Sequence, residues 1–335
     1  METALVLAHV GADGTLGKPA LEVLAAAKSL GGEIVVGLVG GTAQAAADQI
    51  AGCGAARILA VTGDAFTHSR YRTDAAAAEA LCRAAGAPLV IAPSTTRWAR
   101  ALPGVAYRLG GRIDTHATNL AVRDGAPAVT RWFYRQRMEA VLTRAERPWV
   151  VLVDPGCYTP WSGAPGTAVV ESVAVEAPPC RTNVAGVQAP KADEQTIRPE
   201  ADLLFVAGAG WTKKQADGAA HAPEAAALIL GFLRAAKASL GGSKSLVDLS
   251  GEGEAVLPFM THLNQIGQTG ATPRHPKGLS TCCHGEEPHV VGWRFVNQRR
   301  AINLDPNCGW ARGKADVLYV ADAFEVMRKV NELLG

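Results

Sequence analysis

The first half of the chain alternates two kinds of segment, and this alternation limits the possible folds more than any other feature. Short apolar runs rich in β-branched residues alternate with Ala- and Leu-rich stretches of helical period. In order, the segments are 4–10, 19–30, 34–39, 43–50, 58–61, 74–85, 89–92 and 98–109. Neighbouring parallel strands need long crossover connections, and helices supply them. The order therefore predicts an α/β domain, a nucleotide-binding-like parallel sheet with helices on both faces.

The pattern changes after Asn119. Four segments there have the composition of strands and no helical stretch between them: 119–123, 130–136, 138–144 and 149–154. Strands joined by short turns pair in antiparallel fashion. We therefore expect a local antiparallel or mixed extension of the first sheet.

The length of 335 residues favours two domains, because single cores rarely grow that large. Pro178, Pro179, Pro190 and Pro199 interrupt a polar stretch that has no consistent apolar period. We place the connection at residues 177–200, which separates an N-terminal α/β domain, 1–176, from a C-terminal one, 201–335.

The second half predicts a smaller, doubly wound α/β unit. Its expected elements are a strand at 203–207, a helix at 223–240, strands at 246–249, 294–303 and 317–320, and a closing helix at 323–334. Between Gly251 and Trp293 the chain is rich in Gly, Pro, His and Thr. Such loops form the mouth of a sheet, where ligands bind. We expect the functional chemistry of the chain in that region.

Charge and hydropathy exclude several classes of partner. The net charge is only +2, without the basic excess that nucleic acids or anionic membranes attract. No uninterrupted apolar run approaches the roughly 18 residues of a membrane span. The opening residues lack the basic region and cleavage site of a secretory signal. We expect a chain without nucleic-acid partner or membrane span.

The seven cysteines show no CxxC spacing. An odd number without such spacing fits free thiols in a reducing compartment better than a disulfide framework. We therefore expect a cytoplasmic location.

A Gly-Gln-Thr-Gly run, Gly267 to Gly270, stands within the loop-rich region. Glycines let the backbone approach a flat or anionic ligand closely, while Gln268 and Thr269 offer directed hydrogen bonds to ring heteroatoms. The run is a weak signal alone, since an ordinary glycine-rich loop has the same composition.

Four further blocks accompany this run. In chain order the five blocks are Gly241-Gly242-Ser243-Lys244, Gly267-Gln268-Thr269-Gly270, Gly285-Glu286-Glu287-Pro288-His289, Ile302-Asn303-Leu304-Asp305-Pro306 and Val320-Ala321-Asp322-Ala323-Phe324-Glu325-Val326. Their order and composition resemble the FAD domain of the electron-transfer flavoprotein alpha subunit family. The resemblance extends to the N-terminal half through Leu5 to His9, Pro19 to Lys28, Gly54-Ala55 and Arg108 to Gly110.

The resemblance implies an electron carrier rather than an enzyme. It implies FAD held mainly by the C-terminal domain, a smaller beta subunit that contacts the N-terminal domain in a heterodimer, and electrons received from a flavin dehydrogenase and passed to a downstream acceptor. The protein would supply binding and orientation while the cofactor supplies the redox chemistry.

The resemblance also implies roles for individual residues. Ser243 matches a serine at the FAD diphosphate, and Lys244 matches an arginine near the isoalloxazine ring. Gln268, Thr269 and Gly270 match the segment that lines the flavin, with the Thr hydroxyl facing N5. His289 matches a histidine near flavin O2. Asn303 and Asp322 match residues on the adenosine side, and Asp322 also suits the N-cap of the final helix.

The chain departs from the family pattern at several positions. Gly210 stands where the family has an arginine on the phosphate side, Pro288 replaces a glutamine, and Tyr134-Arg135-Gln136-Arg137 replaces a Tyr-Gly-Gly-Asn turn. These departures motivate an alternative, a scaffold subunit of a dehydrogenase complex whose flavin site has weakened.

A third function class, an adenine-nucleotide hydrolase or a metalloenzyme that uses the Cys/His segment, rests on composition alone. Cys282-Cys283-His284, with Glu286, Glu287 and His289, contains atoms suited to zinc, but adjacent cysteines chelate poorly. Gly208 to Gly210 is a fragment of a dinucleotide fingerprint and weak evidence for NAD. We expect no metal and no catalytic residue.

Overall fold

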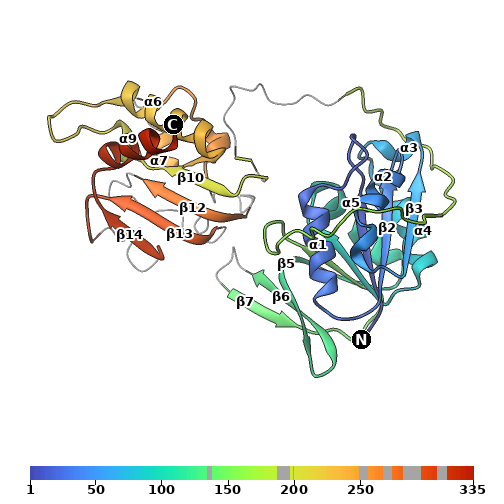
Figure 1. Ribbon diagram of the computed structural model, residues 1–335. Helices are drawn as coiled ribbons and strands as arrows, with labels where there is room; N and C mark the ends of the chain where they lie inside the picture. Colours follow the sequence, from blue (N-terminus) through green and yellow to red (C-terminus); the bar gives the residue numbers. More distant parts are fainter. Residues whose placement is uncertain are drawn as a thin grey trace. The chain divides into compact units, whose positions relative to one another are not determined.

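The computed structural model describes residues 1–133, 138–186, 197–198, 200–248, 256–266, 274–281, 296–307 and 315–335. The chain divides into two compact units, Met1–Val187 and Gln188–Gly335, each built of helices and a sheet (Figure 1). The two-domain α/β architecture predicted from the sequence is confirmed. The division falls inside the predicted connection 177–200, whose bounds stay a prediction. Within the described ranges no helix is long and apolar enough to cross a membrane.

Within the described part of the first unit, nine strands form one sheet in the order β7-β6-β5-β8-β4-β1-β2-β3-β9. The strands are β1 (Ala4–His9), β2 (Ile34–Gly40), β3 (Arg57–Thr62), β4 (Leu89–Pro93), β5 (Arg112–Arg123), β6 (Ala126–Phe133), β7 (Met138–Leu142), β8 (Trp149–Val153) and β9 (Glu171–Ser172). The β5–β6 and β6–β7 pairs are antiparallel and the other pairs are parallel. The expected extension is therefore present.

Helices cover both faces of this sheet, as the alternation predicted. They are α1 (Lys18–Lys28), α2 (Gln44–Gln49), α3 (Asp64–Thr67), α4 (Tyr71–Ala85) and α5 (Thr96–Arg108). Leu24 of α1 packs in the core on one face, and Leu81 of α4 and Leu102 of α5 pack on the other. Strands such as β4 and β8 are buried along their whole length, which explains their continuous apolar sequences.

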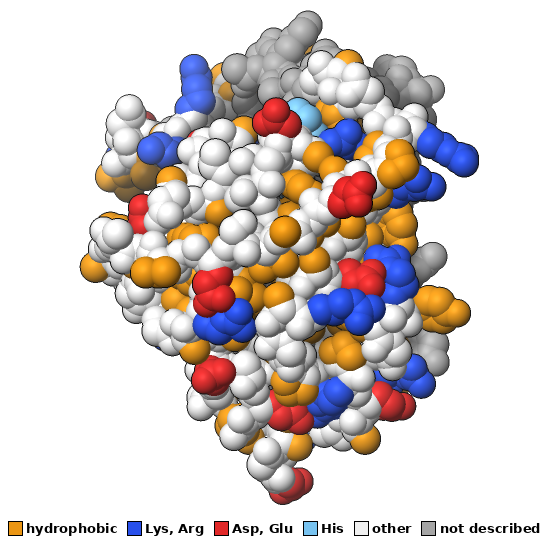
Figure 2. All heavy atoms as spheres, turned by 90° about the vertical axis from the view of Figure 1, so that its right-hand side faces the viewer, with side chains coloured by type: hydrophobic (Ala, Val, Ile, Leu, Met, Phe, Trp, Pro, Cys, Tyr) orange, Lys and Arg blue, Asp and Glu red, His pale blue; other side chains and the backbone are white. Residues whose placement is uncertain are grey.

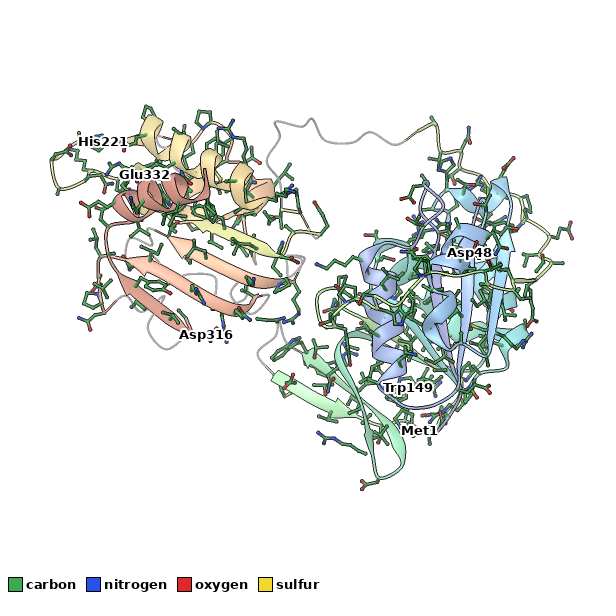
Figure 3. All side chains as sticks on the ribbon, viewed as in Figure 1. Met1, Asp48, Trp149, His221, Asp316 and Glu332 are labelled. Atoms are coloured by element: carbon green, nitrogen blue, oxygen red, sulfur yellow. The ribbon has the colours of Figure 1, made fainter. Side chains whose placement is uncertain are left out.

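After β8 the chain returns across the first unit. The Ala168 amide donates to Oδ1 of Asp48 at 2.9 Å, and Asp48 is labelled in Figure 3. Next, β9 pairs with β3, where the Arg57 guanidinium binds both carboxylate oxygens of Glu171.

On the face shown in Figure 2, Lys and Arg side chains are interspersed with Asp and Glu rather than gathered in one patch.

The described residues of the second unit form a sheet of five parallel strands in the order β11-β10-β12-β13-β14. These are β10 (Leu203–Ala207), β11 (Ser239–Gly242), β12 (His275–Thr281), β13 (Val296–Asn303) and β14 (Val317–Val320). Its helices include α6 (Ala222–Ala236), α7 (Lys244–Asp248) and α9 (Ala323–Leu334), with 3-10 turns η2 (Ala209–Thr212) and η4 (His262–Asn264). Phe232 of α6 and Met327 of α9 pack with Phe205 of β10 in one core.

Two predictions about this unit are wrong. The helix expected at 223–240 ends at Ala236, and β11 follows at once. The strand expected at 246–249 begins inside helix α7. Glycine is unfavourable inside strands, so the Gly241-Gly242 pair did not predict the strand β11. The glycines are needed for packing, because a Cβ would lie 2.7 Å from Ile266 Cδ1 at Gly241 and 2.3 Å from Met260 Cε at Gly242.

Strand β12 was not expected either, because Pro276, Lys277 and Gly278 interrupt any apolar pattern. The strand forms through its neighbours, pairing with β10 on one side and β13 on the other. A strand paired on both sides satisfies its backbone groups whatever its propensity.

Candidate functional site

The carboxyl ends of the five strands of the second unit lie along one edge of its sheet, because all five are parallel. The chain leaves β10, adds β11 on one side, and then crosses to add β12 on the other. Open α/β sheets bind ligands at such a switch point, outside the carboxyl ends of the strands. Ser243 follows β11, Asn303 ends β13 and Asp322 comes two residues after β14. The fold thus brings these three predicted site residues, far apart in the sequence, to one edge.

Ser243 connects β11 to α7. Its amide donates to the carbonyl of Ala207 at 2.9 Å, and its Oγ accepts a hydrogen bond from the Leu246 amide at 3.2 Å. The hydroxyl hydrogen can still be donated to another acceptor. Lys244, the first residue of α7, is exposed. A half-buried hydroxyl therefore lies next to an exposed ammonium at the end of β11.

Asn303 and Asp322 have structural partners at the same edge. Asn303 is buried, and its Oδ1 accepts from the Asp305 amide at 3.5 Å. Oδ1 of Asp322 accepts from the Phe324 amide at 2.7 Å and from the Glu325 amide at 3.2 Å. The predicted N-cap role of Asp322 is confirmed, and the adenosine-side role of both residues stays a prediction.

The remaining predicted site residues, Gln268, Thr269, Gly270 and His289, lie outside the described residues. The same holds for Pro288 and for the Cys282-Cys283-His284 segment considered for zinc. Among the residues that are described, no group of three or more His, Cys, Asp and Glu could hold a metal ion.

The departure at Gly210 lies in a tightly packed turn. Turn η2 follows β10, and its Trp211 is fully buried. The Trp211 Nε1–H donates to Thr281 Oγ1 at 2.8 Å, and the Thr281 hydroxyl donates to the Val206 carbonyl at 3.1 Å. These bonds join the carboxyl ends of β10 and β12. Hydrogen bonds from a buried indole thus fix the turn at the point where the family pattern has an arginine.

Gln265, which precedes the Gly-Gln-Thr-Gly run, is a further candidate that was not predicted from the sequence. Its side chain is only 7% exposed, and within the described part of the chain neither Oε1 nor Nε2 has a hydrogen-bond partner. Gln265 lies opposite Gly242 in a parallel β-bridge. Sequence alone could point to this glutamine only through its proximity to the run, since burial and missing partners are tertiary properties.

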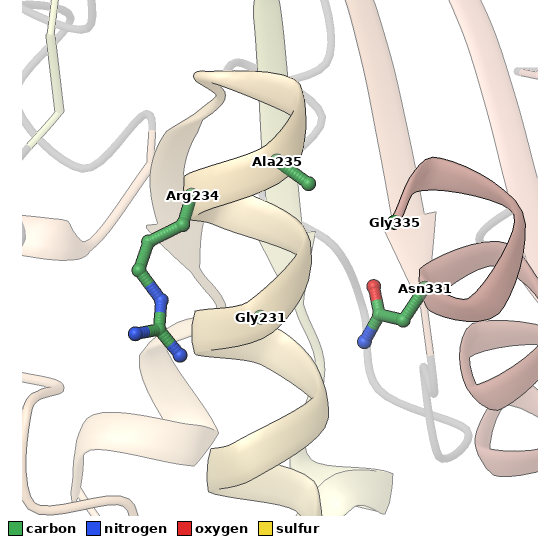
Figure 4. Close-up of a pocket in the computed structure, with 5 residues that line it drawn as sticks. All are labelled: Gly231, Arg234, Ala235, Asn331 and Gly335. Carbon is green, nitrogen blue, oxygen red and sulfur yellow. The ribbon is translucent and has the colours of Figure 1, made fainter.

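A cavity of about 440 Å³ lies elsewhere in the unit, between α6 and α9 (Figure 4). Its lining residues are Gly231, Arg234, Ala235, Asn331 and Gly335. The first three lie in the C-terminal half of α6, Asn331 lies in the C-terminal half of α9, and Gly335 follows α9. Helices in such folds run antiparallel to the strands, so this cavity lies toward the amino ends of the strands, away from Ser243 and Asp322.

The comparisons with known proteins bear on the first unit. A family model described as "Electron transfer flavoprotein domain" matches residues 4–178, slightly more than half of the chain. No curated protein matches the chain. Among solved structures, the chain is similar to the SsfS6 glycosyltransferase of Streptomyces sp. SF2575, at 13% identity and a TM-score of 0.27. That match covers 99% of this chain and 91% of the other, but so low a score supports no inference about function.

The matched region contains all nine strands of the first sheet. Its N-terminal segments are among those that resembled the family in sequence. The chain therefore belongs to the electron transfer flavoprotein family.

Proposed function

We propose that this chain is the FAD-binding alpha subunit of an electron-transfer flavoprotein and works as an electron carrier in a heterodimer with a beta subunit. The observation that supports this most is the convergence of Ser243, Asn303 and Asp322 at the carboxyl edge of one parallel sheet. The sequence resemblance selected these residues without knowledge of the strand order. Their convergence at a ligand-binding edge is what a dinucleotide site requires.

The residues present fit a flavin dinucleotide. The buried carboxamide of Gln265 lies next to β11 and has no hydrogen-bond partner among the described residues. A ligand or a water molecule normally satisfies a buried amide of that kind. Ser243 would donate to the diphosphate, Lys244 would lie near the flavin ring, and Asn303 and Asp322 would hold the adenosine side. When bound, FAD supplies the electron transfer itself.

The chain would contribute binding, orientation and charge. An exposed lysine beside a serine hydroxyl supplies a positive charge and a directed donor for an anionic ligand. Gln268, Thr269, Gly270 and His289 complete the proposed site as flavin-side residues. The beta subunit and a donor flavin dehydrogenase are the proposed protein partners, and the cytoplasm is the proposed location.

A second candidate is a scaffold subunit of a dehydrogenase complex with a weakened flavin site. The observation that favours it is Gly210, which leaves no cationic side chain on the buried turn after β10. Both candidates assign the chain to the same family, but they differ in whether the purified protein carries flavin.

The visible absorption spectrum of the chain coexpressed with its beta subunit decides between them. The electron-carrier proposal expects flavin bands near one FAD per heterodimer, whereas a colourless, folded heterodimer would refute it and favour the scaffold. Lys244→Gln provides a matched test, because the side chain is exposed. It should weaken FAD binding several-fold, measured by titrating the FAD-free heterodimer with FAD.

A further inference from the structure

Gln265 is held in a fixed position next to the outermost strand of the second unit. Its amide donates to the His262 carbonyl at 3.2 Å, and the following amide, of Ile266, donates to the Gly242 carbonyl at 3.1 Å. Bridged residues present their side chains to the same face of a sheet. The face of Gly242 carries Met260 and Leu246. The carboxamide of Gln265 therefore lies on the α7 face of the sheet, near the turn that contains Ser243.

The neighbouring residue shows that this carboxamide is an exception. Asn264 is fully buried, and its side chain accepts from the Thr261 amide at 3.0 Å and donates to the Leu240 carbonyl at 3.4 Å. Gln265 is nearly as buried, yet both polar atoms of its side chain lack partners in the described structure. Burial of an unsatisfied amide is unfavourable in the free protein. A bound ligand that supplies the missing partners would remove that penalty.

The chemistry of the side chain restricts the ligand group. A carboxamide donates through Nε2 and accepts through Oε1, so a phosphate, which only accepts, would satisfy one atom and not the other. The complementary group must both donate and accept. In FAD, the imide edge of the flavin ring, the ribityl hydroxyls and the amino edge of adenine have this property.

The strand order separates Gln265 from the residues proposed for the adenosine. Gln265 lies one strand position outside β11, and β13, which ends in Asn303, lies three positions inward. Four intervals of about 4.8 Å place them about 19 Å apart. If Asn303 and Asp322 hold the adenosine, the carboxamide lies at the flavin end of the cofactor.

We infer that Gln265 is an FAD-binding residue whose carboxamide pairs with the imide edge or a ribityl hydroxyl at the flavin end. The inference rests on the proposed function. It predicts opposite effects on stability and binding, because the side chain has no partner among the described residues without FAD and would gain one with it.

The test uses Gln265→Met, which keeps an unbranched side chain of similar length and removes both polar atoms. The FAD-free heterodimer should melt about 2–4 °C higher than wild type. The Kd for FAD should rise about tenfold, as expected for the loss of one or two neutral hydrogen bonds. The affinity for ADP, which competes with FAD but lacks the flavin end, should not change.

Two control variants separate a binding role from a structural one. Asn264→Leu removes satisfied hydrogen bonds and should lower the melting temperature. Ser280→Ala removes another buried group without a partner in the described structure, Oγ of Ser280 in β12. It should leave the FAD affinity unchanged.

The FAD affinity, the ADP affinity and the melting temperature of Gln265→Met together show whether Gln265 binds FAD. An unchanged FAD affinity in Gln265→Met, with wild type binding FAD normally, overturns it, as does an equal loss of ADP affinity. A lower melting temperature would show that the carboxamide is a structural residue. If wild type itself binds no FAD, the proposed function fails first, so the two failures are distinguishable.

Discussion

The imidazole of His9 stacks on the indole of Trp98, with ring centroids 3.7 Å apart and an interplanar angle of 21°. His9 ends β1 and Trp98 lies in the first turn of α5. In the described structure neither nitrogen of His9 has a hydrogen-bond partner. Burial, and secondarily the charge of Arg97, lower the pKa of His9 to about 2. The folded first unit therefore contains a neutral imidazole.

This depressed pKa predicts an acid-dependent loss of stability. Below an unfolded-state pKa of about 6.5, the unfolded chain binds a proton that the folded chain does not. The free energy of unfolding therefore decreases as the pH falls, by up to about 1.4 kcal/mol per pH unit. Above that pH the effect vanishes. His9→Phe keeps an aromatic stack. It should reduce the difference in unfolding free energy between pH 8 and pH 5 by about 2 kcal/mol. Urea unfolding at the two pH values measures it.

A second histidine variant tests whether the pH dependence of stability is caused by the burial of His9. His68 is exposed in the same unit, and His68→Phe should behave like wild type. Equal changes in both variants would contradict the prediction.

Asp114 should be a sensitive charged position of the first unit. Its carboxylate is almost fully buried and accepts from Trp149 Nε1 at 2.9 Å, from Arg131 Nη1 at 3.2 Å and from two nitrogens of Arg144; Trp149 is labelled in Figure 3. Asp114→Ala leaves the Arg131 charge and the buried Trp149 N–H without their acceptor. The unfolding free energy should fall by about 3–5 kcal/mol, measured by urea denaturation.

The pH dependence of this network has a defined sign. Burial acts to raise the pKa of Asp114, but hydrogen bonds from Arg144 and Trp149 and the charge of Arg144 lower it overall. Its contribution is therefore present above the unfolded-state pKa and is lost as the pH falls through the folded-state value. Glu146→Ala is the control, because the ion pair of the Glu146 side chain with Arg112, at 3.6 Å, is exposed. A similar loss in both variants would refute the prediction.

Asp322 allows capping and cofactor binding to be separated. Asp322→Ala removes the acceptor of the Phe324 and Glu325 amides and should lower the stability of the second unit by about 1 kcal/mol. Asp322→Asn keeps a capping oxygen and should retain most of that stability. If Asp322 also contacts the adenosine, the Asp322→Asn variant should bind FAD more weakly although its stability is nearly normal. FAD titration beside urea unfolding measures both, and unchanged affinity in the Asn variant would limit Asp322 to the cap.

The sequence by itself determined the elements whose signals are local. Strands β10 and β14 and helix α9 were predicted with the bounds that the structure has. Each combines a short apolar run or a helical period with a clear boundary, such as the Asp322 cap. The alternation in the first half determined the helices on both faces of its sheet for the same reason.

Only the tertiary structure decided β11 and β12, because their glycine, proline and lysine residues become strands through pairing with β10 and β13. It also decided that Ser243, Asn303 and Asp322 share one edge, since strand order is a property of long-range pairing that no local pattern encodes. The case of Gln265 is similar. Its side chain is buried and without a described partner because η4 places it against Gly242, whereas the satisfied Asn264 next to it has nearly the same chemistry.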